Sequence, residues 1–409
     1  MYKRQDYGRF YVLITDLIIM SFNFTVLTLF SSLSSHISLT YGLSIESLKW
    51  AASAFTIGIF FAFLIGHSKY FEYEPKLGVL VAGLAVSIPQ FLIPFIGNFI
   101  AITALRIVQG LAMAAIPVFS YQAGTVFPRH RTLAIGIIVS GIFIGGFLGS
   151  TLGPELALHI GWKLTFIVFG LVTLILTLIY VTLIPDKYLP PKRVAEEEAI
   201  EFSVWREKFT VIWGFTFFPG LWIVFTLAPL IHFISESMYE VSGTLSSTIL
   251  ESSYIVWSYI PGVALALLKH SRLNARTLFR SVAITQAVLY ILSMIGALAI
   301  LLIHNPMTFL ALLTILAAVQ GTGPTFWSVQ TIAYPKHIAH RAGYALGVIS
   351  NSAALVGPIA TLLISSLGPT NIWLLIIALN IAGVIITLIG MKTRLPVEKL
   401  SSGAFSTSS

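Results

Sequence analysis

The sequence contains no cysteine and few charged residues. Without cysteine, the chain has no disulfide framework, no thiolate nucleophile and no cysteine-ligated metal. Charged residues make up 10% of the 409 residues, whereas soluble proteins carry about 25%. Too few charged side chains remain to cover a surface that faces water. The composition therefore excludes a soluble enzyme, a nucleic-acid-binding domain and a disordered scaffold.

Long apolar segments fill most of the chain, which is 56% hydrophobic with a mean hydropathy of +0.90. A helix of about 20 apolar residues spans a bilayer core of about 30 Å. We therefore predict an all-α polytopic membrane protein with twelve transmembrane helices. The predicted spans of the first half are 10–34, 47–66, 76–96, 99–126, 132–157 and 163–184. Those of the second half are 209–233, 247–268, 277–303, 307–333, 342–366 and 370–391.

One polar stretch, PDKYLPPKRVAEEEAIEFSVWREK at residues 185–208, separates six spans from six. It predicts an N-terminal six-helix bundle at 1–184, a cytoplasmic linker at 185–208, a C-terminal six-helix bundle at 209–391 and a cytoplasmic tail at 392–409. Within the linker, AEEEAIEFSVWREK forms either an amphipathic helix on the membrane surface or a solvated connection.

The basic residues lie almost entirely on one side of this topology. With the N-terminus in the cytoplasm, every Lys and Arg except Lys49, Lys163 and Arg106 falls on the cytoplasmic side. The positive-inside rule thus predicts a multi-pass protein of the plasma membrane with both termini cytoplasmic and the basic opening MYKRQDYGRF retained. The net charge of +8 reflects this topology, so we expect no nucleic-acid partner. The expected partners are the lipid bilayer and a small-molecule substrate, bound by a monomer.

The two halves share an internal repeat. Gln109-Gly110 recurs as Gln320-Gly321. Parallel six-span repeats are typical of secondary transporters whose substrate site lies near the midplane between the halves. The number of residues that separates Gln109 from Gln320 also separates four further identical pairs, which are Ala134 and Ala345, Gly136 and Gly347, Gly146 and Gly357, and Trp162 and Trp373.

The fourth span, LRIVQGLAMAA at residues 105–115, resembles the fourth-helix motif of the major facilitator superfamily, an Arg followed three residues later by Gln-Gly and then small residues. FPRHRTLAIGI and GWKLTF also resemble this family, and the similarity covers nearly the whole chain. The resemblance implies two pseudo-symmetric bundles that transport by alternating access. The family's motif between spans two and three is degraded, because Tyr70, Tyr73 and Glu74-Pro75 occupy its acidic, glycine and Arg-Lys positions.

The fifth span resembles a motif of proton-driven drug antiporters. Either its glycines allow close helix packing, as small residues such as Gly110 do, or the chain shares the antiporters' export function. Ser150 stands where the motif has proline, and Pro154 where it ends in glycine. The matching positions are Gly136, Gly145, Gly149 and Gly153.

Two ionisable residues lie clearly inside predicted spans, where charge is costly and usually functional. Asp16 lies about 10 Å from the cytoplasmic end of the first span, and Arg106 about 12 Å from the outer end of the fourth. We expect Asp16 to take up and release a coupling proton while Arg106 modulates its affinity or binds an anionic substrate. The alternatives are a static ion pair, or an Asp16 that only caps the first helix.

Arg106 corresponds to Ala317 in the repeat, so charge-based binding belongs to the N-terminal half. Asn23 and Gln109 are candidates for uncharged hydrogen bonds within the spans. Glu251 is a candidate second protonation site near the outer end of the eighth span. The second half offers neutral and aromatic candidates for substrate binding, although such residues also pack helices: Trp213, Phe217, Gln320, Thr322 and Trp327.

No motif for covalent catalysis, phosphate binding or metal binding occurs in a usable context. We therefore expect no enzyme, no metal and no cofactor apart from H+ as the coupling ion. The sequence favours a proton-coupled secondary transporter of a small organic solute, with a slight preference for export. An importer or uniporter for a sugar or carboxylate is the second interpretation, and a non-transporting receptor or scaffold with the same fold is the third.

Overall fold

The computed structural model describes residues 8–66, 74–190, 204–267, 274–303, 305–365, 368 and 370–401. These residues form helices and no strand. Ten helical segments are long and apolar enough to cross a membrane, and the helices Ile45–Gly66 and Lys336–Ser365 complete the set of twelve. The predicted all-α fold with twelve crossing segments is confirmed.

We call the first six crossing segments the N-bundle. Several of its spans are divided into two or more shorter helices. The first segment is interrupted at Thr25, and the fourth tightens into a 3-10 helix after Gln109. Its helices are α1 (Gly8–Phe24), α2 (Val26–Ser32), α3 (Ser34–Tyr41), α4 (Ile45–Gly66), α6 (Pro75–Leu92), η1 (Ile93–Phe95), α7 (Phe99–Gln109), η2 (Gly110–Ala115), α8 (Ile116–Val126), α9 (Arg131–Ile160) and α10 (Trp162–Leu183).

The C-bundle, formed by the second six segments, repeats the 3-10 break in its fourth span, at the position of Gln320-Gly321. Its helices are α11 (Lys208–Tyr239), α12 (Gly243–Leu267), α13 (Ala275–Leu302), α14 (Pro306–Leu316), η7 (Ala317–Gly321), α15 (Thr322–Ser328), α16 (Gln330–Ala333), α17 (Lys336–Ser365) and α18 (Thr370–Lys392), followed by α19 (Pro396–Ser401).

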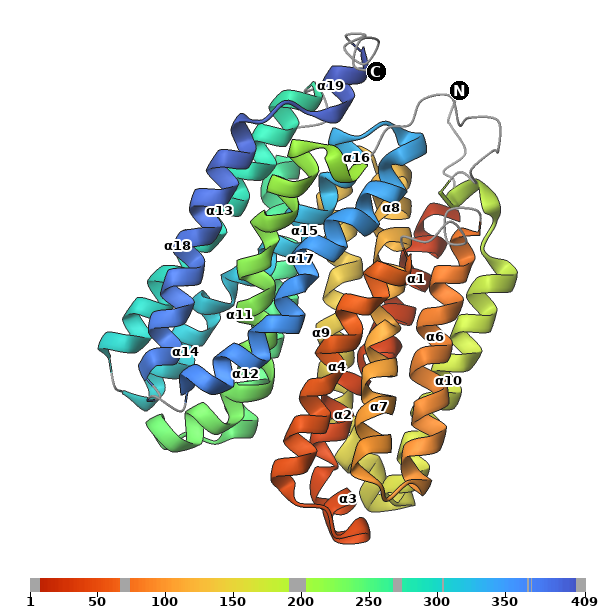
Figure 1. Ribbon diagram of the computed structural model, residues 1–409, viewed down its shortest axis with the longest axis vertical. Helices are drawn as coiled ribbons and strands as arrows, with labels where there is room; N and C mark the ends of the chain where they lie inside the picture. The colour runs from red at the N-terminus through yellow and green to blue at the C-terminus, as the bar shows by residue number, and fades with distance from the viewer. Residues whose placement is uncertain are drawn as a thin grey trace.

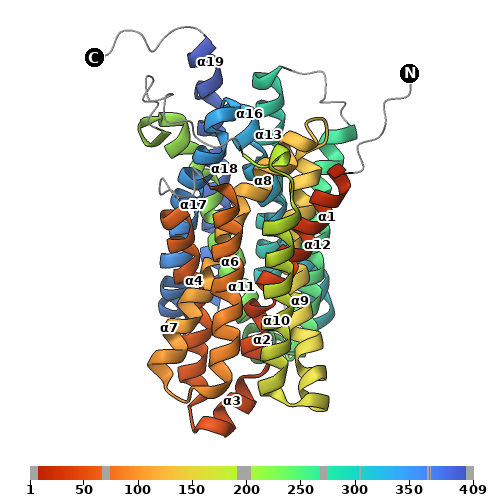
Figure 2. The same cartoon turned by 90° about the vertical axis from the view of Figure 1, so that its right-hand side faces the viewer.

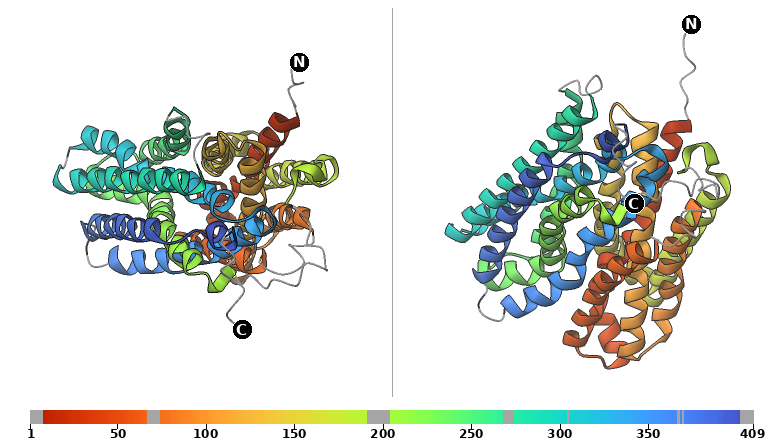
Figure 3. Two further views of the ribbon diagram at one scale, coloured as in Figure 1. Left: turned by 90° about the horizontal axis from the view of Figure 1, so that it is seen from above. Right: turned by 45° about the horizontal axis from the view of Figure 1, so that its top comes forward.

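The bundles lie side by side (Figure 3), and both described chain ends lie at one face of the molecule, which we call the terminal face (Figure 1). The short helix α3 lies at the opposite face (Figure 2). Helix α9 packs against α12, and α4 against α17, so one helix pair on each side joins the two bundles.

The sequence repeat corresponds to equivalent contacts between the bundles. A Cβ atom on Gly136 of α9 would lie 2.1 Å from the carbonyl oxygen of Ser258 in α12. A Cβ atom on Gly347, its counterpart in α17, would lie 2.0 Å from Cδ1 of Phe63 in α4. Because both glycines allow the close approach of a helix from the other bundle, the repeat preserves the two contacts that join the bundles.

The outer surface of the helices is apolar, as the composition predicts. Because hydrocarbon replaces water around a membrane protein, the helices can satisfy their backbone groups internally and direct apolar side chains outward. Exposed large apolar side chains occur on helices of both bundles: Ile14, Leu64, Ile88, Ile175, Val263, Ile295 and Ile385.

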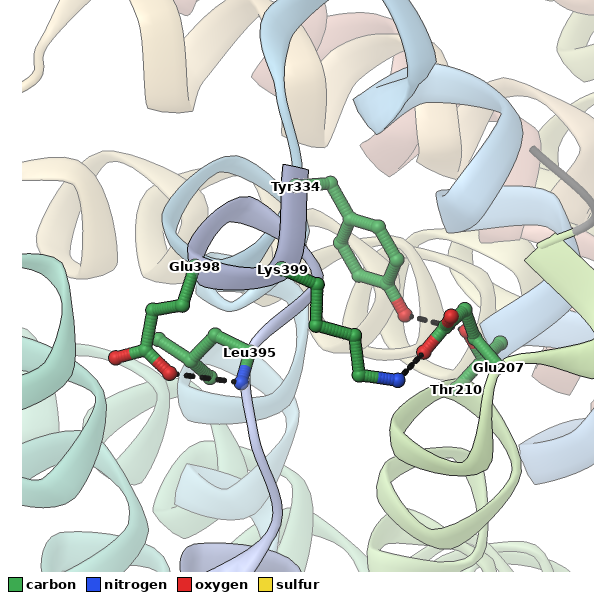
Figure 4. A network of polar contacts seen from close by, with 6 residues as sticks. All are labelled: Glu207, Thr210, Tyr334, Leu395, Glu398 and Lys399. Carbon is green, nitrogen blue, oxygen red and sulfur yellow. Dashed lines mark hydrogen bonds and ion pairs between the residues drawn. The ribbon is translucent and has the colours of Figure 1, made fainter. Parts of the chain in front are cut away.

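The C-terminal segment is attached to the terminal face of the C-bundle. Lys399 Nζ forms an ion pair with Glu207 Oε2 (2.7 Å), next to the hydrogen bond between Thr210 Oγ1 and the hydroxyl of Tyr334 (2.7 Å) (Figure 4). Leu395 is buried below this network. The described end of the predicted tail therefore packs on the bundle.

Much of the predicted linker lies outside the described residues, which omit 191–203. Residues Asp186–Tyr188 and Val204–Arg206 form short 3-10 turns. Most of the candidate amphipathic helix also falls in the omitted range. The boundaries proposed for the linker and for the tail thus stay predictions.

Candidate functional site

The bundles are joined between the terminal face and the middle of the spanning helices. Toward the opposite face their ribbons diverge (Figure 1). Phe63 of α4 stacks on Trp327 of α15, with ring centroids 5.7 Å apart. Hydrogen bonds between the bundles run from the Tyr344 hydroxyl to Ala114 O (3.1 Å), from Arg131 Nη1 to Thr331 O (2.9 Å), from Gln330 Nε2 to Pro117 O (3.2 Å) and between Ser140 Oγ and the Tyr259 hydroxyl (2.7 Å).

A buried carboxyl group lies near this closed side. Asp16 of α1 is fully buried, and neither of its carboxyl oxygens has a hydrogen-bond partner among the described residues. It interacts electrostatically with Tyr180 of α10, whose hydroxyl donates to Gln122 Oε1 (2.7 Å). Tyr344 of the other bundle lies within electrostatic range of Tyr180. We call Asp16, Gln122, Tyr180 and Tyr344 the Asp16 cluster.

The Asp16 cluster connects a titratable group to the contact between the bundles. The hydroxyl of Tyr344 donates to the carbonyl oxygen of Ala114 in η2, and α1, which carries Asp16, packs against the same segment η2. Separation of the bundles at the terminal face would therefore change the surroundings of Asp16. The sequence singled out Asp16 because a charge inside a span is rare, whereas tyrosine and glutamine gave no comparable signal.

Arg106 is buried inside the N-bundle and is engaged by main-chain oxygens. Its Nη1 donates to Val26 O (2.8 Å) and to Gln109 Oε1 (2.7 Å), and its Nη2 donates to Ala52 O (3.3 Å). The guanidinium carbon lies 4.9 Å from the ring centroid of Phe30. Arg106 thus ties α7 to α4 and to the start of α2, directly after the break at Thr25.

Asp16 and Arg106 do not form an ion pair in this structure. Val26, which accepts a hydrogen bond from Arg106, follows Asp16 by ten residues, about 15 Å along a helix. The two groups lie on opposite sides of the α1–α2 break because the guanidinium extends toward α2. The roles predicted for them in coupling stay predictions, and the ion pair considered as an alternative is not present in this structure.

The uncharged candidates of the N-bundle are both buried. Gln109 accepts the hydrogen bond from Arg106, and its Nε2 has no partner in the described part of the chain. Asn23 of α1 has no partner there for either side-chain atom. An unpaired buried amide is costly, so Asn23 is available to a bound solute or to water.

The candidates of the C-bundle divide between two locations. Trp213 and Phe217 of α11 pack within their own bundle, against Phe279 (5.0 Å between centroids) and Phe326 (4.8 Å), respectively. Of the other two, Trp327 lies against the N-bundle. Gln320 Nε2 donates weakly to Ser258 Oγ (3.4 Å) on α12, whereas Trp327 stacks on Phe63.

A second polar network in the C-bundle was not predicted from the sequence. The Tyr290 hydroxyl of α13 donates to Thr216 O (2.7 Å) and accepts from the main-chain N–H of Gly220 (3.1 Å). Thr322, a predicted site residue, donates to Val319 O (2.6 Å) and also interacts with Tyr290. Gln286, one helical turn before Tyr290, also donates to Thr216 O (3.2 Å). The spacing of these two polar residues in an apolar span is a signal that could have identified this network.

The motif glycines act in helix packing. Cβ atoms on Gly145 and Gly149 would lie 2.1 Å from Ser21 O and 2.3 Å from Thr25 O, both on the first segment of the same bundle. Gly153 faces a Leu29 methyl group, and Pro154 lies within α9. A Cβ atom on Gly110 would lie 2.2 Å from the carbonyl oxygen of Phe55. Close packing therefore accounts for these positions without reference to the direction of transport.

The sequence matches the model of the Major Facilitator Superfamily over residues 17–361, which is most of the chain. The chain belongs to the major facilitator superfamily. It is thus a multi-pass membrane protein of a family whose members are transporters and not enzymes. Among the described side chains no group of three or more His, Asp or Glu residues forms a metal site.

Relatives with curated names match parts of the chain. The uncharacterised MFS-type transporter YybF of Bacillus subtilis is 25% identical over 130 residues, 31% of this chain and 32% of YybF. The probable sulfoacetate transporter SauU of Cupriavidus necator is 25% identical over 209 residues, 46% of this chain and 49% of SauU. The matched segments thus span about a third to a half of these relatives.

A solved structure supports the fold over the whole chain. The human organic anion transporter MFSD10 (TETRAN) superposes with a TM-score of 0.70, covering 94% of this chain and 100% of that chain. Sequence identity between the two is 14%. At this identity the similarity supports the shared architecture, not a shared substrate.

Proposed function

We propose that this protein is a proton-coupled secondary transporter of a small organic solute, with Asp16 as a proton carrier. The observation that carries the proposal is the position of Asp16, fully buried without a hydrogen-bond partner among the described residues, in a cluster that includes Tyr344 of the other bundle. An unpaired ionised carboxylate away from water is far costlier than a neutral acid. Asp16 therefore carries a proton while the terminal side is closed and releases it when water enters there.

The direct test is transport by Asp16→Asn in proteoliposomes with an imposed pH gradient. Asparagine has nearly the size of the neutral acid but cannot exchange a proton. We expect it to abolish concentrative transport driven by the gradient and to leave solute exchange without a gradient intact. Asp16→Glu, which retains the carboxyl group, serves as the control. Wild-type accumulation by Asp16→Asn would contradict the assigned proton carrier.

Alternating access makes a separate prediction at the terminal face. A Cβ atom on Gly124 would lie 3.1 Å from Cβ of Thr331, near the 3.5–4.5 Å range of disulfides. Because the chain has no cysteine, Gly124→Cys with Thr331→Cys forms a unique pair. We expect oxidation to link the bundles and reduce transport at least about tenfold, and dithiothreitol to restore it. Each single variant controls for the substitutions, and unchanged transport by the oxidised pair would contradict a terminal side that must open.

With the termini in the cytoplasm, as the basic residues predict, the closed terminal side is the cytoplasmic side. Reaction of membrane-impermeant maleimide with Ser401→Cys in intact cells and in inverted vesicles tests this orientation. Labelling in inverted vesicles alone agrees with it, and labelling of intact cells contradicts it. The export preference rests on the fifth-span glycines alone.

An organic acid is a second candidate for the solute. SauU is named a probable sulfoacetate transporter, so sulfoacetate and short carboxylates belong in the proteoliposome screen beside neutral and cationic compounds. The two terminal nitrogens of Arg106 are engaged by Val26, Ala52 and Gln109, whereas its Nε has no partner among the described residues. An anion would therefore meet the Nε of Arg106 or the unpaired amide of Asn23.

A further inference from the structure

A second buried carboxyl group lies where α12 meets the N-bundle. Glu251 follows the start of α12 at Gly243 by eight residues, about 12 Å along the helix. It is 4% exposed, and its Oε2 has no hydrogen-bond partner among the described residues. One turn further on, the hydroxyl of Tyr254 is also buried and unpaired within that part of the chain.

The N-bundle covers this carboxyl group with small and apolar side chains. A Cβ atom on Gly146 of α9 would lie 3.5 Å from Glu251 Oε1 and 3.6 Å from Cγ2 of Thr28 in α2. The ring of Phe143, one turn before Gly146, lies 4.9 Å from the ring of Tyr254. Glu251 thus lies at a contact between helices of both bundles, and not at the lipid surface.

No cation compensates Glu251 among the described side chains. Tyr254 is the titratable group that interacts with it. On α9, Arg131 lies at the terminal end, whereas Glu155 and His159 pair with each other at the opposite end (3.1 Å). The helices α14, η7 and α15 carry no charged residue. Two other neighbouring helices carry titratable residues. These are Lys208, His232, Glu236 and Tyr239 of α11 and Arg276, Arg280 and Tyr290 of α13. The side chains of His232 and Glu236 are not among those that the structure describes.

We propose that Glu251 is a second proton-binding site, in the bundle that does not contain Asp16. A proton from water binds at Oε2 and keeps the carboxyl group neutral while α9 and α12 are in contact. When water reaches this contact, the proton leaves to water and the carboxylate accepts a hydrogen bond from the Tyr254 hydroxyl. The energetic reason is that removal of an unpaired charge from water is costly, whereas a neutral acid can remain in a dry contact.

This inference rests on the proposed proton-coupled transport, but it places a separate site in the other half of the repeat. Asp16 lies eight residues from the start of α1 at the terminal face, and Glu251 lies eight residues from the start of α12 at the opposite face. The two acids are therefore offset toward opposite faces. Each is expected to exchange its proton with a different aqueous side.

Infrared spectroscopy of the purified protein tests the site without knowledge of the solute. A protonated carboxylic acid has a C=O stretching band that is separate from the amide and carboxylate bands. We expect Glu251→Gln to remove one such band from the spectrum at neutral pH, and Glu251→Asp to restore a band at a shifted position. Glu155→Gln is the matched control, because Glu155 is an exposed carboxylate on the neighbouring helix, and it should leave these bands unchanged.

The results for the two acids are distinguishable. A spectrum of Glu251→Gln that retains every protonated-acid band would overturn this inference and leave the role of Asp16 untouched. Loss of a band in Glu251→Gln but not in Asp16→Asn would support the Glu251 site and contradict the proposed proton on Asp16. If Glu251→Gln does not fold, Glu251→Asp is measured in its place, and a spectrum in which no acid band shifts contradicts the inference.

Discussion

Replacing Arg106 with alanine is expected to lower the thermal midpoint of the detergent-purified protein by roughly 10 °C, and to abolish transport with it. The guanidinium donates to the carbonyl oxygens of Val26 and Ala52 and to the side chain of Gln109. Hydrogen bonds to charged groups contribute about 1.5–3 kcal/mol each. Their removal releases the start of α2 from α7, so the first segment loses its anchor next to the break at Thr25.

Two controls separate this structural role from a role in binding or coupling. Arg106→Lys keeps the charge but lacks the planar fork that reaches several acceptors at once, so an intermediate midpoint is expected. Arg129→Ala removes an exposed positive charge at the terminal face and should leave the midpoint unchanged. A wild-type midpoint for Arg106→Ala, together with weaker solute binding, would instead assign Arg106 to the substrate site.

The sequence located the spans well because they depend on composition alone. Twenty apolar residues in a row predict a crossing helix regardless of what surrounds them, and the offset that relates Gln109-Gly110 to Gln320-Gly321 led to two equivalent bundles. The break at Thr25 was missed, since no proline or glycine marks it. It is accompanied by the hydrogen bond from Arg106 to Val26 O, a tertiary contact that no local pattern contains.

The site was predicted less completely for a related reason. The rarity of charge in a span identified Asp16 and Arg106, but the partners of Arg106 are mostly main-chain oxygens, which every residue possesses. The other members of the Asp16 cluster are Gln122, Tyr180 and Tyr344, from three different helices, and of these Tyr180 is the one that interacts electrostatically with Asp16. Only the packing of α8, α10 and α17 brings them together. Types of residue were therefore predictable, and their pairing was not.

Adjacent glycines in α9 give a second large expected effect. A methyl group on Gly145 would lie 2.1 Å from the carbonyl oxygen of Ser21 and 2.8 Å from the carbonyl carbon of Phe24. Both contacts are main-chain atoms of α1 and cannot rotate away. Overpacking typically costs about 1–3 kcal/mol and sometimes more. We therefore expect Gly145→Ala to reduce the folded fraction several-fold, measured as the monodisperse peak in size-exclusion chromatography.

The neighbouring Gly146 supplies a control with the same helix and the same chemical change. A methyl group there would meet its nearest atom, Glu251 Oε1, at 3.5 Å, an ordinary contact. Because alanine stabilises a helix by up to about 1 kcal/mol relative to glycine, Gly146→Ala should keep or raise the thermal midpoint. Gly149→Ala should resemble Gly145→Ala, and Gly153→Ala should be milder because its contact is a movable Leu29 methyl group. Equal effects at Gly145 and Gly146 would contradict the close contact between α9 and α1, and a large effect at Gly146 alone would assign the tight contact to the bundle interface instead.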